Sequence, residues 1–232
     1  MKQLTDSLYQ IGFGPVNAYL IEDNGFTLID TGLPGSAEKL FAEMKKAGKN
    51  PDKITSIILT HSHTDHAGSV ADLVSRLNIP VMAYGLDADL IEKGIASRPM
   101  SLVPGIKNWL LYNLFIKKTS KTIAPVKISR RLNDLEVLPV GSGLQIIHTP
   151  GHSAGHISLL MKKEGVLIAG DICSNMPGLS YSPVYENLEV GKSSLQKVCG
   201  FDFNRVVFGH GNMLEDALDK MKAEFGVKHG AE

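Results

Sequence analysis

The sequence is poor in cysteine, balanced in charge and free of long apolar runs. Cys173 and Cys199 are its only cysteines, which is too few for a disulfide framework, so we expect a cytoplasmic protein. Basic and acidic residues number 24 each, and this balance gives no general attraction to nucleic acid. No apolar run approaches the roughly 20 residues of a membrane span. Residues 1–14 lack the pattern of a secretion signal. We therefore expect neither a nucleic-acid partner nor a transmembrane segment.

A chain of 232 residues suits one α/β domain, and we expect a single domain over residues 1–232. Apolar, β-branched runs of strand length predict strands at 26–30, 56–60, 144–148, 166–170 and 205–209. Their near-continuous apolarity is typical of strands that are covered on both faces. Helical spacing predicts helices over 36–47, with Ser36 as the cap, over 67–77 and over 214–221.

Residues 93–133 lack acidic side chains altogether but contain nine basic ones. The same segment holds the apolar stretch NWLLYNLFI and the only tryptophan, Trp109. This composition differs from that of the rest of the chain. We therefore expect residues 93–133 to be an insertion rather than a core βα unit.

The sequence LTHSHTDHAGS, residues 59–69, directly follows an apolar run. Imidazole nitrogen and carboxylate oxygen are preferred ligands of Zn²⁺ and its first-row neighbours. In an extended segment residues two apart point the same way, so His61 and His63 can bind one ion together. Asp65 and His66 follow where the chain enters a helix and can face a second ion. A solvated polar loop is the alternative interpretation.

Two ions require more than four ligands, and further candidates follow the other predicted strands. These are HTPGHSAGH at 148–156, Asp171 in GD and His210 in GH. Together with LIDTG, which contains Asp30, and HSHTDH, the ordered motifs TPGHSAGH, AGD and FGHG resemble those of the metallo-β-lactamase superfamily of binuclear hydrolases. The resemblance is to the branch that includes type II glyoxalases and lactonases, without assigning a subfamily.

The resemblance implies an α/β fold, a four-layer αββα sandwich, with residues 93–133 as a helical cap beside the site. It implies a first metal ion held by His61, His63 and His152. It also implies a second ion held by Asp65, His66 and His210, with Asp171 bridging the two ions. Asp30 would orient a ligand histidine; its alternative role is to form the turn at the end of a strand.

Two adjacent ions can share a water molecule and lower its pKa toward about 7, which makes hydroxide available as the nucleophile. Asp65 is the candidate catalytic residue, as a proton shuttle. Zinc is the expected metal, with iron or manganese as alternatives. We expect hydrolysis of a small ester, thioester or lactone. A phosphodiester or phosphonate hydrolase and a non-catalytic metal-binding protein remain open as alternatives.

Several neighbouring residues have two possible roles. His148 and His156 would be satisfied interior histidines or substrate contacts, and Cys173 an inert buried thiol or a group near the metals. Acyl-homoserine lactonases place a tyrosine three residues after the bridging aspartate, where this chain has Ser174. Tyr181 or Tyr185 could approach the site by another loop.

The cap has three possible roles. It could pack against the domain and a dimer partner, or form an apolar channel for an acyl or aromatic substrate, or dock on a membrane surface. For the channel, the candidate substrate-binding residues are Trp109 and the cations Arg98, Lys107 and Lys117, which would meet an anionic group. The partners expected are thus a small molecule with an apolar and an anionic part, and a second subunit bound through the cap.

Overall fold

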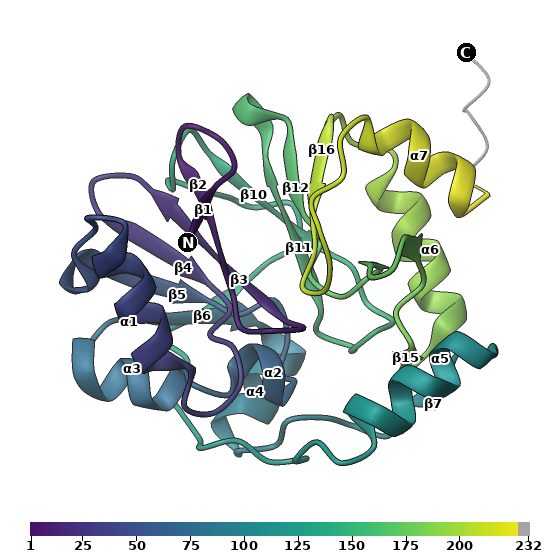
Figure 1. The fold of residues 1–232 in the computed structure, drawn as a ribbon, viewed down its shortest axis with the longest axis horizontal. Helices are drawn as coiled ribbons and strands as arrows, with labels where there is room; N and C mark the ends of the chain where they lie inside the picture. Colours follow the sequence, from purple (N-terminus) through teal and green to yellow (C-terminus); the bar gives the residue numbers. More distant parts are fainter. Residues whose placement is uncertain (227–232) are drawn as a thin grey trace.

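Two β-sheets stack face to face, and helices cover the outer face of each sheet (Figure 1). The structure is a computed structural model that describes residues 1–226, so the last six residues of the expected 1–232 domain lie outside the described part. The first sheet contains, in spatial order, β1 (Lys2–Gln3), β2 (Leu8–Gly12), β3 (Asn17–Glu22), β4 (Phe26–Ile29), β5 (Ile54–Ile58), β6 (Val81–Tyr84) and β8 (Arg130–Leu132). The second contains β16 (Arg205–Val207), β12 (Val166–Ile168), β11 (Ile157–Met161), β10 (Leu144–His148) and β9 (Val137–Leu138).

The helices divide between the two outer faces. Figure 1 shows α1 and α3 beside the first sheet and α6 and α7 beside the second. The helices are α1 (Ser36–Lys46), α2 (Thr64–Ala67), α3 (Val70–Leu77), α4 (Gly85–Glu92), α5 (Ile106–Leu111), α6 (Leu188–Val198) and α7 (Ala217–Glu224). Short helical turns are η1 (Pro51–Lys53), η3 (Lys162–Glu164) and η2 (Tyr112–Ile116), a π-helical continuation of α5. Two small ladders pair β13 (Ser174–Asn175) with β14 (Leu179–Ser180) and β7 (Ser101–Leu102) with β15 (Val184–Tyr185).

Neighbouring residues of the central strands belong to different hydrophobic clusters. In β5, Ile57 packs with the helices outside the first sheet, whereas Ile58 lies between the sheets. In β10, Ile146 faces the first sheet and Ile147 packs with Leu195 of α6. Because side chains alternate along a strand, both faces of these strands are buried, which explains their continuous apolarity. The αββα sandwich predicted from the sequence is confirmed.

The five predicted strands are present, each within two residues of the predicted bounds at either end. The central strands β3 and β11 were not predicted. Their short apolar runs are not distinguishable by periodicity from buried helix segments, and their identity depends on pairing with distant neighbours.

The predicted helix bounds need three corrections. The helix expected over 67–77 is broken between α2 and α3, where the chain passes so close to Pro34 that a Cβ on Gly68 would lie 2.5 Å from the proline ring. Ser36 does not cap α1 with its side chain; its backbone N–H instead donates to Ser69 Oγ. The last helix begins at Ala217 rather than residue 214, because the backbone of Leu214 pairs with that of Val206.

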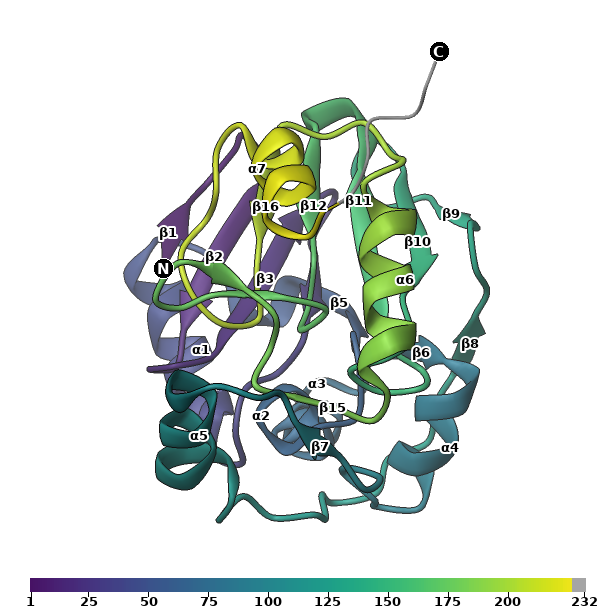
Figure 2. The same ribbon diagram turned by 90° about the vertical axis from the view of Figure 1, so that its right-hand side faces the viewer.

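Residues 93–133 form the single helix α5–η2 within otherwise extended chain, and α5 lies at the same end of the molecule as α2 and α4 (Figures 1 and 2). The segment expected as an insertion ends inside the core, because β8 pairs in parallel with β6. Among the helices of residues 1–226, none combines the length and apolar character needed to cross a bilayer.

Candidate metal centre

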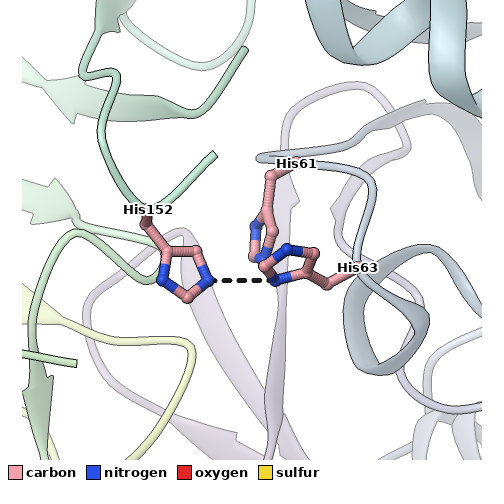
Figure 3. A group of neighbouring side chains, drawn as sticks. All are labelled: His61, His63 and His152. Carbon is pink, nitrogen blue, oxygen red and sulfur yellow. Dashed lines mark hydrogen bonds between the residues drawn. The ribbon is translucent and has the colours of Figure 1, made fainter. Parts of the chain in front are cut away.

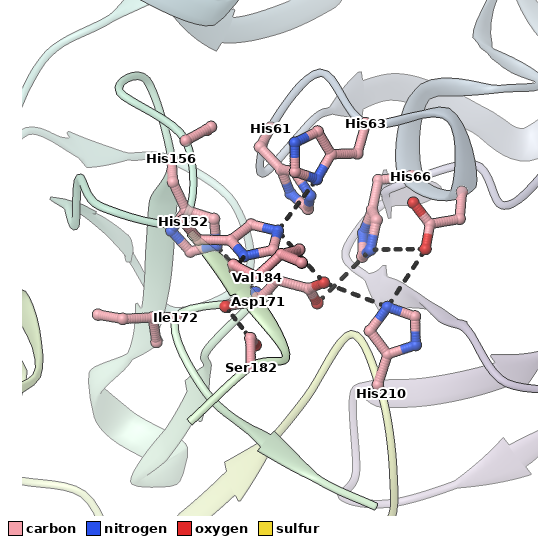
Figure 4. A network of polar contacts seen from close by, with 12 residues as sticks. His61, His63, His66, His152, His156, Asp171, Ile172, Ser182, Val184 and His210 are labelled. Atoms are coloured by element: carbon pink, nitrogen blue, oxygen red, sulfur yellow. Dashed lines mark hydrogen bonds and ion pairs between the residues drawn. The ribbon is translucent and has the colours of Figure 1, made fainter. Parts of the chain in front are cut away.

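Four strands end at the same rim of the sandwich, and each is followed by a cluster residue. His61 and His63 follow β5, His152 follows β10, Asp171 follows β12 and His210 follows β16 (Figure 4). The short helix α2 adds Asp65 and His66. Three groups have ligand atoms within 4.8 Å of one another: His61–His63–His152, His61–His66–Asp171 and Asp65–His66–His210. All seven ligand residues expected from the sequence are thus brought together.

The first group consists of three imidazoles buried against one another (Figure 3). His152 Nε2 lies 3.0 Å from His63 Nδ1, and the ring centroids of His61 and His63 are 4.5 Å apart. Burial lowers the pKa of His63 to about 4 and that of His152 to about 3. These rings are therefore neutral at pH 7, the form in which histidine binds a metal.

Neighbouring groups fix the tautomers of the ligand histidines. His152 Nδ1 lies 2.9 Å from Val184 O, and His210 Nδ1 lies 2.7 Å from Pro15 O. A carbonyl oxygen only accepts, so each Nδ1 carries a proton and Nε2 is the only ring nitrogen that can offer a lone pair to the cluster. Each Nε2 is thereby left as a ligand atom facing the cluster.

Asp30 orients two more imidazoles, that of His66 directly and that of His61 through Thr60. Its carboxylate accepts from His66 Nδ1 at 2.8 Å and from Thr60 Oγ1 at 2.7 Å. Because Thr60 donates its proton to Asp30, its oxygen accepts from His61 Nδ1 at 2.9 Å. Asp30 also has the φ of 61° of a turn residue. It therefore both shapes the end of β4 and orients His66.

The second group is Asp65–His66–His210, which combines imidazoles with a carboxylate and lies beside the carboxylate of Asp171. Asp171 Oδ2 lies 3.1 Å from His210 Nε2 and 3.6 Å from His152 Nε2, so it contacts ligand atoms of both groups. Asp65 Oδ2 lies 3.2 Å from His210 Nε2. Burial would lower the pKa of His210, but Asp171 and Asp65 outweigh it and raise the pKa to about 10. This carboxylate-rich group therefore favours positive charge.

Several polar atoms of the cluster have no hydrogen-bond partner, and they indicate whether the cluster suits metal ions. In the described residues, the Nε2 atoms of His61, His63 and His66 and Oδ1 of Asp171 are buried without a hydrogen-bond partner. Such atoms cost free energy unless another group satisfies them. A Cβ on Gly209 would lie 2.0 Å from Asp171 Oδ1, so the space beside the carboxylate depends on glycine. Lone pairs of nitrogen and oxygen that converge in this way fit divalent transition-metal ions.

The two flanking histidines differ in role. His156 Nε2 accepts from the backbone N–H of Asp171 at 2.9 Å, so His156 positions the loop that carries Asp171. His148 stacks on Tyr84 with ring centroids 3.9 Å apart. Cys173 is buried in the cluster between the second sheet and its helices, where burial raises the pKa of its thiol well above the usual value. Cys173 is therefore a neutral thiol at pH 7.

Asp87 of α4 is a site-organising residue that sequence reasoning missed. Its buried carboxylate accepts from Ser62 N at 3.0 Å, from Ser153 Oγ at 2.7 Å and from Gly155 N at 3.0 Å. Ser62 lies between His61 and His63, and Ser153 follows His152. Asp87 thus joins the two loops that carry the first group. An aspartate in the first turn of a helix gives no sequence signal for this role.

A cavity of about 220 Å³ opens beside the cluster. Its polar lining consists of His63, Thr64, Asp65, Ser97, Thr119, Ser120, His152, Asp171, Ser174 and His210. Its apolar lining consists of Pro15, Leu33, Ala96, Met100, Leu111, Phe115, Ile116, Met176, Pro183 and Val184. None of the described lining residues is a lysine or an arginine.

The four candidate substrate contacts from the cap do not line this cavity. Arg98 Nη1 lies 3.2 Å from Asp87 and 3.3 Å from Glu186, and Lys107 Nζ lies 3.0 Å from Ser180 Oγ. Trp109 and Lys117 are exposed. Arg98 and Lys107 thus have partners within the protein. Substrate contact by the four residues stays a prediction.

Neither candidate tyrosine lines the cavity. The Tyr185 hydroxyl is buried, donates to Ile172 O and accepts from Ser182 N. Tyr181 packs on Phe225. Ser174, which occupies the position three residues after Asp171, does line the cavity.

Comparison with known proteins gives consistent matches. Residues 11–210 match the family model described as the metallo-beta-lactamase superfamily. The chain is 31% identical to the uncharacterized protein YobT of Bacillus subtilis (strain 168), over 90% of this chain and 88% of that protein. It is 28% identical to an N-acyl homoserine lactonase of Bacillus sp, over 65% of this chain and 59% of that protein. A metallo-beta-lactamase family protein from Thermus thermophilus has a similar fold, with a TM-score of 0.72 at 23% identity, over 95% of this chain and 79% of that one.

Proposed function

The chain belongs to the metallo-beta-lactamase superfamily, whose members are generally metal-dependent hydrolases, and from this premise we propose that it hydrolyses a small ester, thioester or lactone at a binuclear centre. His61, His63 and His152 would hold one ion. Asp65, His66 and His210 would hold the other, with Asp171 between them. When bound, divalent ions polarise a carbonyl oxygen and make water a nucleophile near neutral pH. Superfamily members usually bind zinc, which we propose here also.

Asp65 is the proposed proton carrier. Its side chain is 29% exposed and lines the cavity, so it can reach both water and substrate. Although burial alone would raise the pKa of Asp65, His66 and His210 hold it below the usual range. The residue is therefore a carboxylate at pH 7, able to accept the proton of the attacking water and donate it to the leaving group.

The proposed substrate class rests on the residues that line the cavity. The apolar side chains of Leu111, Phe115 and Ile116 line the same cavity as the cluster residues Asp65 and His152. This arrangement suits an uncharged acyl group whose carbonyl carbon reaches the centre. A phosphodiester keeps a negative charge, which no lysine or arginine of the described lining would meet. The N-acyl homoserine lactonase among the relatives supports the same choice.

One experiment tests this proposal. Purified protein should contain about two transition-metal ions per chain, and kcat/KM should rise with acyl length across p-nitrophenyl esters, thioesters and acylated lactones. The panel includes β-lactams, carboxylate-bearing esters and bis-p-nitrophenyl phosphate. Turnover of the phosphodiester alone would replace the proposal with the alternative chemistry. Absence of turnover in fully loaded protein would favour a non-catalytic metal-binding protein.

Asp65→Asn tests the proton role. The amide keeps the size of the side chain but cannot carry the proton, so kcat should fall by about 10²-fold while KM changes little. Steady-state kinetics and metal analysis of the same preparation provide the measurement. An unchanged kcat would remove Asp65 from the mechanism. Loss of metal together with activity would assign it only the role of ligand.

A further inference from the structure

The α5–η2 helix carries apolar side chains on two opposite faces. Leu111, Phe115 and Ile116 line the cavity beside the cluster. Ile106, Leu110 and Leu114, spaced four residues apart, have exposed fractions of 75%, 46% and 68%. Trp109 lies on the same outer face and is 51% exposed. The cavity therefore accounts for one face of the helix and leaves the other uncovered.

This outer face is the main concentration of exposed apolar side chains in the described residues. Of the ten large hydrophobic residues that are exposed in residues 1–226, four lie on this face: Ile106, Trp109, Leu110 and Leu114. Scattered apolar residues on a surface are normal, but a contiguous group of this kind marks an interaction site.

The charges around the helix differ from those in the rest of the basic segment. Arg98, Arg130 and Arg131 form ion pairs with carboxylates from outside residues 93–133. Lys117 and Lys118, directly after the helix, are exposed and form no salt bridge with any carboxylate of residues 1–226. The six lysines of residues 93–133 thus have no salt bridge in the described residues, and two of them, Lys117 and Lys118, directly follow the apolar face.

We propose that the outer face of α5–η2 docks the protein on the surface of an anionic phospholipid bilayer. A helix with tryptophan and leucine on one face, bordered by lysines, lies in the interface plane of a membrane, with its apolar side chains below the headgroups. The charge favours this occupant over a second copy of the chain, because residues 93–133 contain no acidic side chain and an isologous contact through the same segment would offer these lysines no carboxylate. The proposal is independent of the proposed function, since binding is measured without turnover.

Trp109 allows a direct test because it is the only tryptophan of the protein. Full-length protein is mixed with vesicles of phosphatidylcholine and phosphatidylglycerol, or of phosphatidylcholine alone. We expect co-sedimentation and a blue shift of the Trp109 emission with the anionic vesicles, both reduced by added salt. Co-sedimentation without a shift would mean that another surface binds, and would overturn the proposal, as would the absence of binding.

Matched variants locate the binding surface. The double variant Lys117→Gln/Lys118→Gln should weaken vesicle binding by about 20-fold, because each lysine near an anionic surface contributes about fivefold. Leu114→Ser should also weaken it. The control Lys162→Gln/Lys163→Gln removes two adjacent exposed lysines from η3 and should bind like the parent. Equal loss in the control pair would overturn the proposal. A concentration-dependent dimer that Leu114→Ser dissociates, without vesicle binding, would replace the bilayer with a second copy.

Discussion

Asp171→Ala is expected to lower kcat by at least about 10³-fold and to reduce the metal content from about two ions per chain to about one. The reason is geometric: the Asp171 carboxylate lies within 3.6 Å of His152 Nε2 and within 3.5 Å of His66 Nε2, so it contacts both groups. No other carboxylate of the described residues lies against both. Metal analysis and steady-state kinetics on the same preparation measure the two effects.

The control for this variant is Asp202→Ala, which removes an exposed carboxylate that has no side-chain partner among the described residues. It should leave both metal content and kcat unchanged. The circular dichroism spectrum of Asp171→Ala should match that of the parent, because residue 171 follows β12 rather than lying within it. Two bound ions and undiminished turnover in Asp171→Ala would contradict the bridging role.

Asp87→Ala should destabilise the protein by about 2–6 kcal/mol, because two buried backbone donors lose their acceptor and each such loss costs about 1–3 kcal/mol. The two donors are Ser62 N and Gly155 N. The Asp87 side chain is 1% exposed and pairs with Arg98. Urea unfolding of the metal-free protein measures the change in the free energy of unfolding.

Asp87→Asn is a second informative variant. Both carboxylate oxygens of Asp87 accept hydrogen bonds, whereas an amide offers only one acceptor, so Asn should also destabilise. Because Ser62 and Ser153 adjoin ligand histidines, metal affinity should fall by about 10–100-fold as well.

Asp89→Ala, on the same helix, is the matched control for the Asp87 variants. Its side chain is 50% exposed and pairs with Arg131 at the surface, so the change in the free energy of unfolding should be small. A similar loss in the Asp87 and Asp89 variants would show that helix α4, rather than the carboxylate of Asp87, determines the effect.

The fold and the clustering of the candidate ligands could be predicted because both depend on short stretches of sequence. Strands such as β5 and β10 are buried on both faces, so their apolar runs are visible without knowledge of their neighbours. The ligands lie directly after these strands, and the box that contains His61 and Asp65 is contiguous. In contrast, the last helix begins later than predicted. Leu214 pairs with Val206, and this pairing outweighs helical periodicity.

The substrate side of the site could not be predicted in the same way. Charge composition alone predicted a cap with nine uncompensated cations. In the structure, Arg98 and Arg131 pair with acidic residues that precede the segment, and Arg130 pairs with one that follows it. An ion pair depends on the separation of two side chains in space, which the composition of one segment does not contain.

The sequence by itself determined the identity of the candidate metal ligands and the layered α/β architecture, because ligand chemistry and two-sided burial depend on residue type and short spacing. Only the tertiary structure decided which groups hydrogen-bond to those residues and which side chains line the cavity. Asp87 connects the loops of His61 and His152 from a helix far from both in sequence. The two faces of α5–η2 become distinct only when one of them closes the cavity. Such roles depend on contacts between distant segments, and these contacts exist only once the sheets have packed.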